Sequence, residues 1–134
     1  MMSYLQNIKP VDQRFHEWVD NINETEKIDK SIIAFNFGLF ESEEGFTMYL
    51  TGSKIFDEDD DDWATNMDFE PKQKYFSFGN EFLKNKDWQD ILKYAESLVK
   101  SYVKSEDFKT SIFAKAIAIT VGFDDGELTI IKFQ

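Results

Sequence analysis

The dipeptide Asp125-Gly126 constrains the fold of this 134-residue chain more than any other feature of the sequence. It separates two stretches in which apolar and polar residues alternate, Phe113–Phe123 and Leu128–Phe133. Asp-Gly between alternating stretches is a strong signal for a β-hairpin with a two-residue turn, because both turn positions need a positive φ. The sequence therefore predicts an antiparallel strand pair at the C-terminal end.

The predicted turn also fixes a register, which divides this hairpin into two faces. Antiparallel pairing places Val121 opposite Ile130. Phe123 then lies opposite Leu128, and Ile119 shares their face, which we expect to line the core. The other face is small and semi-apolar, so that a helix or a partner can cover it. Its residues are Ala116, Ala118, Thr120, Thr129, Ile131 and Phe133.

Apolar residues at helical spacing predict two main helices. The first covers residues 10–24, with Pro10 near the first turn, where its missing N–H costs little. The second covers about residues 88–105 and begins at Asp87, a plausible N-cap. Its apolar stripe consists of Trp88, Ile91, Leu92, Ala95, Leu98, Val99 and Tyr102.

A second hairpin is predicted earlier in the chain. The apolar stretch Ser31–Phe40 is followed by a turn at Glu41–Gly45 and by alternating residues in Phe46–Ser53. Tyr75–Phe78 is typical of a short strand. The predicted fold is a single α+β domain over residues 1–134, in which an antiparallel sheet of two hairpins packs with two main helices in the order α-ββ-α-ββ.

Six consecutive acidic residues occupy positions 57–62 and end against Trp63. A block of like charges repels itself, so we expect an irregular acidic segment over residues 55–72 that presents negative charge. Trp63 has two interpretations: a core anchor that closes a solvated loop, or an aromatic contact for lysines and arginines of a partner. Both hold if the ring pins the loop and the carboxylates face outward. The candidate partner-binding residues are Asp57, Glu58, Asp59, Asp60, Asp61, Asp62 and Trp63.

The net charge of −11 bears on the partner. Such a field slows approach to phosphate backbones and anionic lipids, so we expect neither nucleic acid nor membrane as a partner. It accelerates encounter with a basic protein, although acidity also serves solubility alone. Met1–Asn7 does not have the pattern of a secretory signal, and no stretch of the sequence is long and apolar enough for a membrane span, so we expect a cytoplasmic protein.

Residues for catalysis are scarce in the sequence. The chain has no cysteine, which excludes disulfides, thiolate nucleophiles and zinc–cysteine sites. His16 is the sole histidine and lies at the edge of the apolar face of the first helix, as an ordinary boundary residue does. No Ser-His-Asp pattern can be built around it, so we expect no enzyme activity.

Calcium is the metal that the acidic run fits best. Asp57, Asp59, Asp61 and Asp68 match ligand positions of an EF-hand-like loop. The sixth position, where glycine permits the sharp turn, is Asp62, and the flanking residues do not indicate two helices. We therefore expect no designed metal site and no cofactor.

Several segments resemble small bacterial proteins of polymorphic-toxin loci, and in style immunity proteins of contact-dependent growth inhibition. The resemblance lies in Tyr49–Lys54, in the acidic run with Trp63-Ala64, and in Glu70-Pro71 with Tyr75, roughly the middle quarter of the chain. Beyond that it extends to size, charge and helix–hairpin layout. Such proteins are cytoplasmic and neutralise a cognate toxin domain, often a basic nuclease. The resemblance implies that the acidic surface is an inhibitory contact.

The leading hypothesis is an immunity or inhibitor protein that binds a basic toxin domain non-covalently through the acidic run. Two alternatives remain open. One is a divalent-metal-binding protein or enzyme that uses the same carboxylates. The other is a structural or adaptor domain that self-associates through the semi-apolar face of the second hairpin. The sequence does not indicate the identity of the partner or the oligomeric state.

Overall fold

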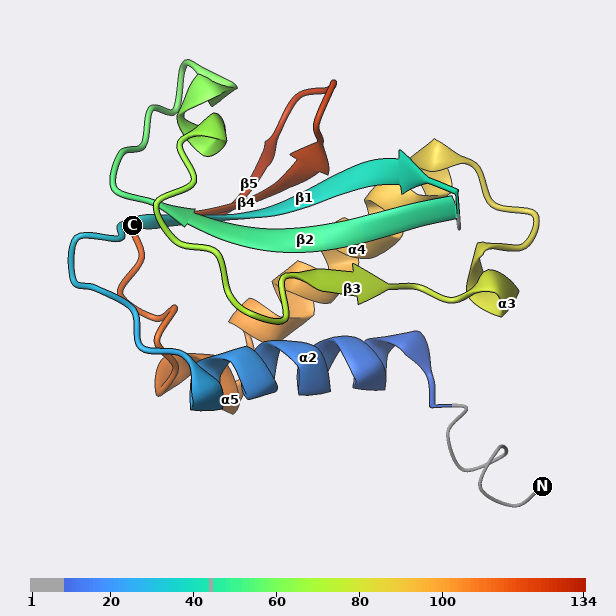
Figure 1. Ribbon diagram of the computed structural model, residues 1–134, viewed down its shortest axis with the longest axis horizontal. Helices are drawn as coiled ribbons and strands as arrows, with labels where there is room; N and C mark the ends of the chain where they lie inside the picture. The colour runs from blue at the N-terminus through green and yellow to red at the C-terminus, as the bar shows by residue number, and fades with distance from the viewer. Residues whose placement is uncertain (1–8, 44) are drawn as a thin grey trace.

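A five-stranded mixed sheet forms the centre of the computed structural model, which describes residues 9–43 and 45–134 (Figure 1). The strand order is β3-β2-β1-β4-β5. Neighbouring strands are antiparallel except β1 and β4, which are parallel. The strands are β1 (Ala34–Ser42), β2 (Gly45–Ser53), β3 (Tyr75–Ser77), β4 (Ala118–Phe123) and β5 (Thr129–Phe133).

The prediction of a purely antiparallel sheet made of two hairpins was wrong. Both hairpins form and the fold is α+β, but β1 and β4 join them in parallel, with Ala34 beside Ala118. The connection from β2 to β4 contains a long helix and brings the chain back to the end of the sheet where β1 begins. β4 therefore runs in the direction of β1, as parallel neighbours require a crossover. Turn residues bear only on the pairing within a hairpin and not on how two hairpins join.

The two predicted main helices are present. They are α2 (Val11–Thr25) and α4 (Trp88–Val103), and both pack on the same face of the sheet. α4 begins at the predicted cap: Asp87 accepts a hydrogen bond from the Asp90 backbone N–H (2.9 Å), and Asp90 accepts one from the Asp87 N–H (3.1 Å). The shorter helices are η1 (Asp61–Thr65), α3 (Asn80–Leu83) and α5 (Glu106–Lys109).

The C-terminal hairpin has a different register from the predicted one. Val121 pairs with Thr129, not Ile130, because a bulge at Ile119/Thr120 shifts the pairing by one residue. Phe123 does not pair with Leu128 either, because the connection between the strands extends from residue 124 to residue 128. The predicted register holds only beyond the bulge, where Ala118 pairs with Phe133.

The bulge also divides the predicted semi-apolar face. On one side of the sheet, the Thr129 hydroxyl donates to Glu96 of α4 (2.7 Å) and Ile131 packs against the main core. Phe133 lies on the other side, where its ring is 5.6 Å from that of Phe56. An extra residue in a strand reverses the facing of the side chains beyond it. The prediction that Thr129, Ile131 and Phe133 share a face was therefore wrong.

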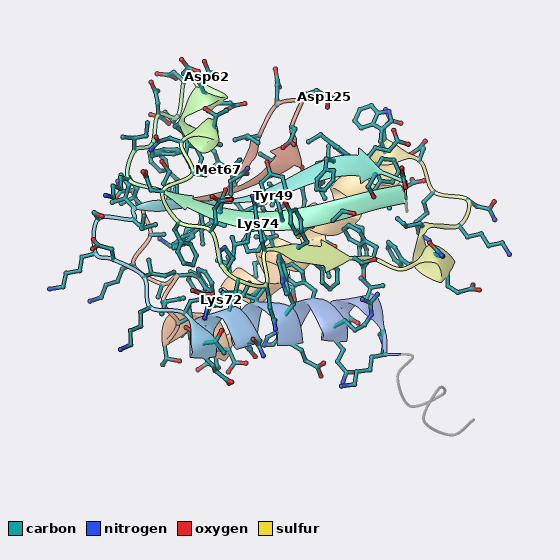
Figure 2. All side chains as sticks on the ribbon, viewed as in Figure 1. Tyr49, Asp62, Met67, Lys72, Lys74 and Asp125 are labelled. Atoms are coloured by element: carbon teal, nitrogen blue, oxygen red, sulfur yellow. The ribbon has the colours of Figure 1, made fainter. Side chains whose placement is uncertain are left out.

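The sheet face opposite α2 and α4 is bordered by two loops (Figure 2). We call it the loop face. One border is the segment 54–70, which carries Asp62 and Met67, and the other is the β4–β5 hairpin, which carries Asp125. Strand alternation gives the loop face a row of small, polar and aromatic side chains. They include Ala34, Asn36, Tyr49, Thr51, Ala118 and Thr120.

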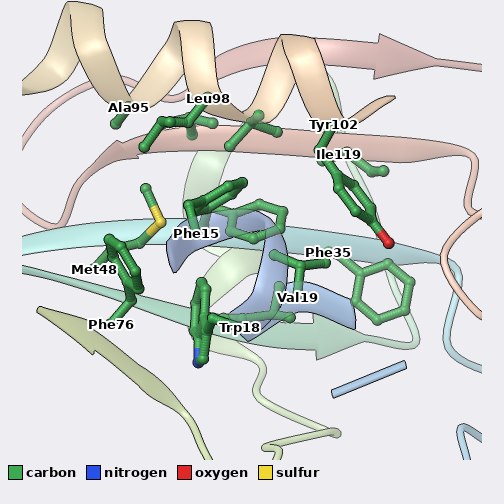
Figure 3. Packing of buried hydrophobic residues seen from close by; sticks show 14 of the residues in the cluster. Phe15, Trp18, Val19, Phe35, Met48, Phe76, Ala95, Leu98, Tyr102 and Ile119 are labelled. Atoms are coloured by element: carbon green, nitrogen blue, oxygen red, sulfur yellow. The ribbon is translucent and has the colours of Figure 1, made fainter. Parts of the chain in front are cut away.

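The hydrophobic core lies between the sheet and the two long helices (Figure 3). Aromatic rings pack there edge to face: Phe15 against Phe76 at 5.7 Å, and Phe35 against Phe113 at 5.0 Å. α4 contributes Leu98 to the same cluster. In the described part of the chain, no helix is long and apolar enough to cross a membrane. The N-terminal stretch Met1–Asn7, considered above for a signal sequence, lies outside the described residues.

Candidate functional site

The acidic run folds into a tight loop because its own carboxylates accept backbone N–H groups. Asp57 accepts a hydrogen bond from the N–H of Asp59 (2.9 Å). Asp60 accepts one from the N–H of Asp62 (3.0 Å) and so caps η1. Such local side-chain turns are a general property of aspartate. The predicted irregular segment thus contains one short helix at its most acidic point.

Trp63 anchors this loop to the sheet. Its side chain is 4% exposed and packs with Ala34 and Ala118, which are paired neighbours on β1 and β4. The two small side chains leave room for the indole, and the Phe56 ring lies edge-on to it at 5.1 Å. The geometry agrees with the anchor interpretation of Trp63. In this conformation the carboxylates of the loop are accessible from solvent and the indole ring is not.

A hydrogen bond joins the acidic run to a second acidic loop. Oδ2 of Asp61 accepts a hydrogen bond from the backbone N–H of Leu128 (3.0 Å) in the β4–β5 hairpin. Figure 2 shows Asp62 and Asp125 near the tips of the two loops, on the same side of the sheet. We call their combined carboxylates the acidic rim: Asp57, Glu58, Asp59, Asp60, Asp61, Asp62, Asp124, Asp125 and Glu127.

Sequence reasoning missed the hairpin part of the rim. Asp125 was interpreted only as a turn residue, and Asp124 and Glu127 were not considered, although their charge was visible. The hairpin folds back because Gly122 has no side chain: a Cβ there would lie 2.6 Å from the carbonyl oxygen of Glu127. This close approach brings the second set of carboxylates toward the first.

Tyr49 of β2 holds the β4–β5 hairpin in place. This largely buried residue of the loop face donates its hydroxyl hydrogen bond to Asp124. Burial, followed by the hydrogen bond to Asp124, raises the pKa of the Tyr49 hydroxyl far above its ordinary value. The phenol therefore stays protonated and remains a donor at neutral pH. It holds one rim carboxylate in a defined position.

Exposed apolar residues lie beside the rim. Tyr75 is 58% exposed, and the ammonium of Lys74 lies 5.4 Å from the centre of its ring. Lys74 also contacts Glu70 (2.6 Å), which raises the pKa of the lysine. Aromatic centres with charged surroundings are typical of protein–protein interfaces. Met67, Ile130 and Phe133 are further large exposed apolar residues on this side.

A groove of about 950 Å³ continues the acidic rim at the end of the sheet. Asp124 and Asp125 line it on one side, and Asp87 and Trp88 line it at the start of α4. Trp88 is 53% exposed, although its place in the apolar stripe predicted a core residue. Its indole packs edge-on to Phe123 at 6.1 Å. The more accessible tryptophan near the acidic residues is thus Trp88, not Trp63.

Lys86 also lines the groove, but its ammonium contacts Phe82. Its ammonium donates to the carbonyl oxygen of Phe82 (2.6 Å) and lies 4.3 Å from the centre of the Phe82 ring. These neutral partners leave the ammonium charged, but four carboxylates outnumber it and make the groove negative. The four carboxylates are those of Glu41, Asp87, Asp124 and Asp125. The groove suits a cationic side chain that can also stack on an indole.

The EF-hand-like pattern does not assemble as a cage. Of its four aspartates, Asp57 and Asp61 bind the backbone N–H groups given above, and Asp68 accepts a hydrogen bond from the N–H of Lys54 (2.7 Å). Across the described ranges, no three ligand oxygens of the acidic run lie within 4.8 Å of one another. The carboxylates of the run shape the loop and present charge.

The arrangement is able to attract cationic groups. Backbone hydrogen bonds hold carboxylates of the acidic run, and Asp124 and Asp125 line the same groove as the exposed Trp88 ring. Carboxylates and aromatic rings both attract lysine and arginine side chains. No protein-family model, no curated protein and no solved structure matches this chain.

Proposed function

We propose that this chain is an immunity or inhibitor protein that neutralises a basic protein domain by non-covalent binding through the acidic rim. The observation that carries the proposal is the hydrogen bond between Asp61 and Leu128, which unites two separate acidic loops into one surface. Exposed aromatic and apolar residues beside that surface supply the contact area that charge alone does not give.

The rim and the groove have different roles in this proposal. The rim carboxylates attract the basic domain over long range and raise the association rate. The groove beside Trp88 receives an arginine or lysine side chain of the partner, which the indole and Asp125 then hold. Binding covers the active surface of the partner, so the inhibition is steric and electrostatic. The chain itself performs no catalysis and acts in the cytoplasm.

The neighbouring reading frame supplies the partner for the test. A large secreted protein encoded immediately upstream, with a variable C-terminal domain, is the expected source of a basic toxin domain. Co-expression of this chain should restore the growth of cells that make that domain, and the two proteins should co-purify as a complex. Unchanged toxicity with no complex would reject the proposed function.

Two variants locate the binding surface in the same assay. Trp88→Ala removes an exposed ring without opening the core, so it should weaken protection while the fold is kept. The matched control is Tyr94→Phe, which changes an aromatic residue of α4 at a surface away from the rim. Equal protection by the Trp88 variant and the wild type would remove the groove from the interface.

A further inference from the structure

A cluster of three potential metal ligands lies on the helix side of the molecule. Nε2 of His16 is 2.8 Å from Oδ2 of Asp107 and 3.3 Å from Oδ2 of Asp20. One ligand atom from each residue lies within 4.8 Å of the other two. His16 and Asp20 belong to α2, and Asp107 belongs to α5. The sequence alone gave no sign of this cluster because Asp107 is 91 residues from His16.

The fold holds these residues in place by local structure. His16 and Asp20 are one helical turn apart, which puts them on the same side of α2. α5 begins at Ser105, whose hydroxyl accepts a hydrogen bond from the Phe108 N–H (3.3 Å). Phe108 is buried and packs edge-on to Tyr102 at 6.2 Å. Asp107 is thereby presented to α2 on a docked helix.

The geometry of this cluster fits a bound metal ion better than a shared proton. One imidazole nitrogen carries at most one hydrogen, so His16 cannot donate a strong hydrogen bond to both aspartates at once. Ligand atoms that surround Zn²⁺ tetrahedrally at about 2.0–2.2 Å lie about 3.3–3.5 Å from one another. The separation between His16 and Asp20 already has this value. Asp107, whose side chain is 61% exposed, is free to move the remaining half ångström.

Tyr102 provides the outer support that such sites need. Its hydroxyl donates to Oδ1 of Asp20 (3.1 Å) and so leaves Oδ2 for an ion. Burial, followed by the nearby Asp20 carboxylate, raises the pKa of the Tyr102 hydroxyl, so the phenol remains a donor. The ring also packs edge-on to the His16 imidazole at 5.0 Å. Both ligands on α2 are thus oriented by one buried residue.

A polar cavity adjoins one member of the cluster, His16. It has a volume of about 330 Å³ and reaches His16 and Tyr102. The hydroxyls of Ser97 and Ser101 and the carboxylate of Asp12 line it as well. Neither Asp20 nor Asp107 lines this cavity, so solvent completes the coordination sphere of an ion: the side chains of His16, Asp20 and Asp107 are 37%, 30% and 61% exposed. The site therefore has three protein ligands and an accessible polar side.

We propose that His16, Asp20 and Asp107 bind a divalent ion of the zinc class and so link α2 to α5. The imidazole ligand selects Zn²⁺ or Co²⁺ over Ca²⁺ and Mg²⁺, which prefer all-oxygen sites. Solvent water occupies the remaining positions. This site is separate from the acidic rim and independent of the proposed inhibitory function.

The sole histidine makes the site testable without ambiguity. Tag-free protein labelled with ¹⁵N is titrated with zinc chloride, and the imidazole nitrogen signals of His16 are followed by NMR. We expect saturation at one equivalent with Nε2 as the shifted nitrogen, and a rise in melting temperature. Co²⁺ should give the visible absorption bands of a four- or five-coordinate site. Zn²⁺ affinity, measured by competition with a chromophoric chelator, should fall about 100-fold or more in Asp107→Asn and about 10-fold in Tyr102→Phe.

Two results would overturn the site. Unchanged His16 signals at millimolar Zn²⁺ would exclude the imidazole as a ligand, and unchanged affinity in Asp107→Asn would exclude α5. A control variant removes three negative charges of the acidic rim instead. It carries Asp59→Asn, Asp62→Asn and Asp125→Asn. It should bind Zn²⁺ as the wild type does, and loss of binding in this variant would place the ion on the rim. Circular dichroism of each variant confirms that the fold is intact.

Discussion

Replacing Trp63 with alanine is expected to release the acidic loop from the sheet. A tryptophan buries about 200 Å² of apolar surface, which at about 25 cal/mol per Å² amounts to about 5 kcal/mol as an upper value. Trp63 belongs to a small cluster with Ala34 and Ala118 at one end of the sheet, outside the main core. A surface loop can partly collapse into the space, so we expect a loss of about 3 kcal/mol in the free energy of unfolding.

The assay combines urea unfolding with amide hydrogen exchange. Asp61 accepts a hydrogen bond from the Leu128 N–H, and we expect this bond to break when Trp63 no longer holds the loop in place. The Leu128 amide should therefore exchange faster in Trp63→Ala, whereas amides between β1 and β2 keep their protection. The matched control is Trp63→Phe, which keeps a ring in the site. Its loss in the free energy of unfolding should be smaller. The anchoring role of Trp63 would be refuted if Trp63→Ala lost less than about 1 kcal/mol in the free energy of unfolding and the Leu128 amide stayed protected from exchange.

Three further perturbations probe the supports of the site. Gly122→Ala puts a methyl group against the carbonyl oxygen of Glu127 and should cost about 1–3 kcal/mol in thermal unfolding; an unchanged melting temperature would show that the hairpin is not folded back. Asp87→Ala removes the capping box of α4 and should cost about 1 kcal/mol in urea unfolding; no loss would refute the cap. Burial raises the pKa of Tyr49 and Tyr102 above the ordinary 10.0, so their stabilising contribution is present below pH 10 and is lost as the pH rises further. The double variant Tyr49→Phe with Tyr102→Phe should therefore lose less stability than the wild type between pH 9 and pH 11, and equal losses would contradict the buried phenols.

Local patterns predicted most of the individual elements of this fold. The apolar periodicity of α2 and α4 and the cap at Asp87 depend on residues within a few positions of one another, and the structure agrees with them. The parallel pairing of β1 with β4 depends on where a connection of more than sixty residues returns to the sheet. A bulge likewise depends on what each side of the strand packs against. Neither has a local signal in the sequence.

In the candidate site, too, the sequence predicted the features that have a local signal and missed those that depend on the fold. The acidic run was evident from its sequence, but its union with the β4–β5 hairpin follows from the fold. Of the two interpretations of Trp63, the structure agrees with the core anchor, whereas Trp88 of the predicted apolar stripe is 53% exposed. Trp63 lies over the small residues Ala34 and Ala118, whereas Trp88 lies in the first turn of α4, where the sheet ends at Phe123. Helical periodicity places Trp88 on the correct side of α4 but does not tell where the sheet beneath it stops.

The most direct test of the acidic rim is the association rate with the basic domain at several salt concentrations. Two variants are compared, each of which raises the net charge of −11 by three units. One neutralises Asp59, Asp62 and Asp125 of the rim, and the other replaces Glu24, Glu81 and Glu106 with glutamine on exposed helical positions. The rim variant should associate about 10-fold more slowly at low salt, with a flatter salt dependence, while the helix variant stays near the wild-type rate. Equal slowing in both variants, or in neither, would contradict a docking surface at the rim.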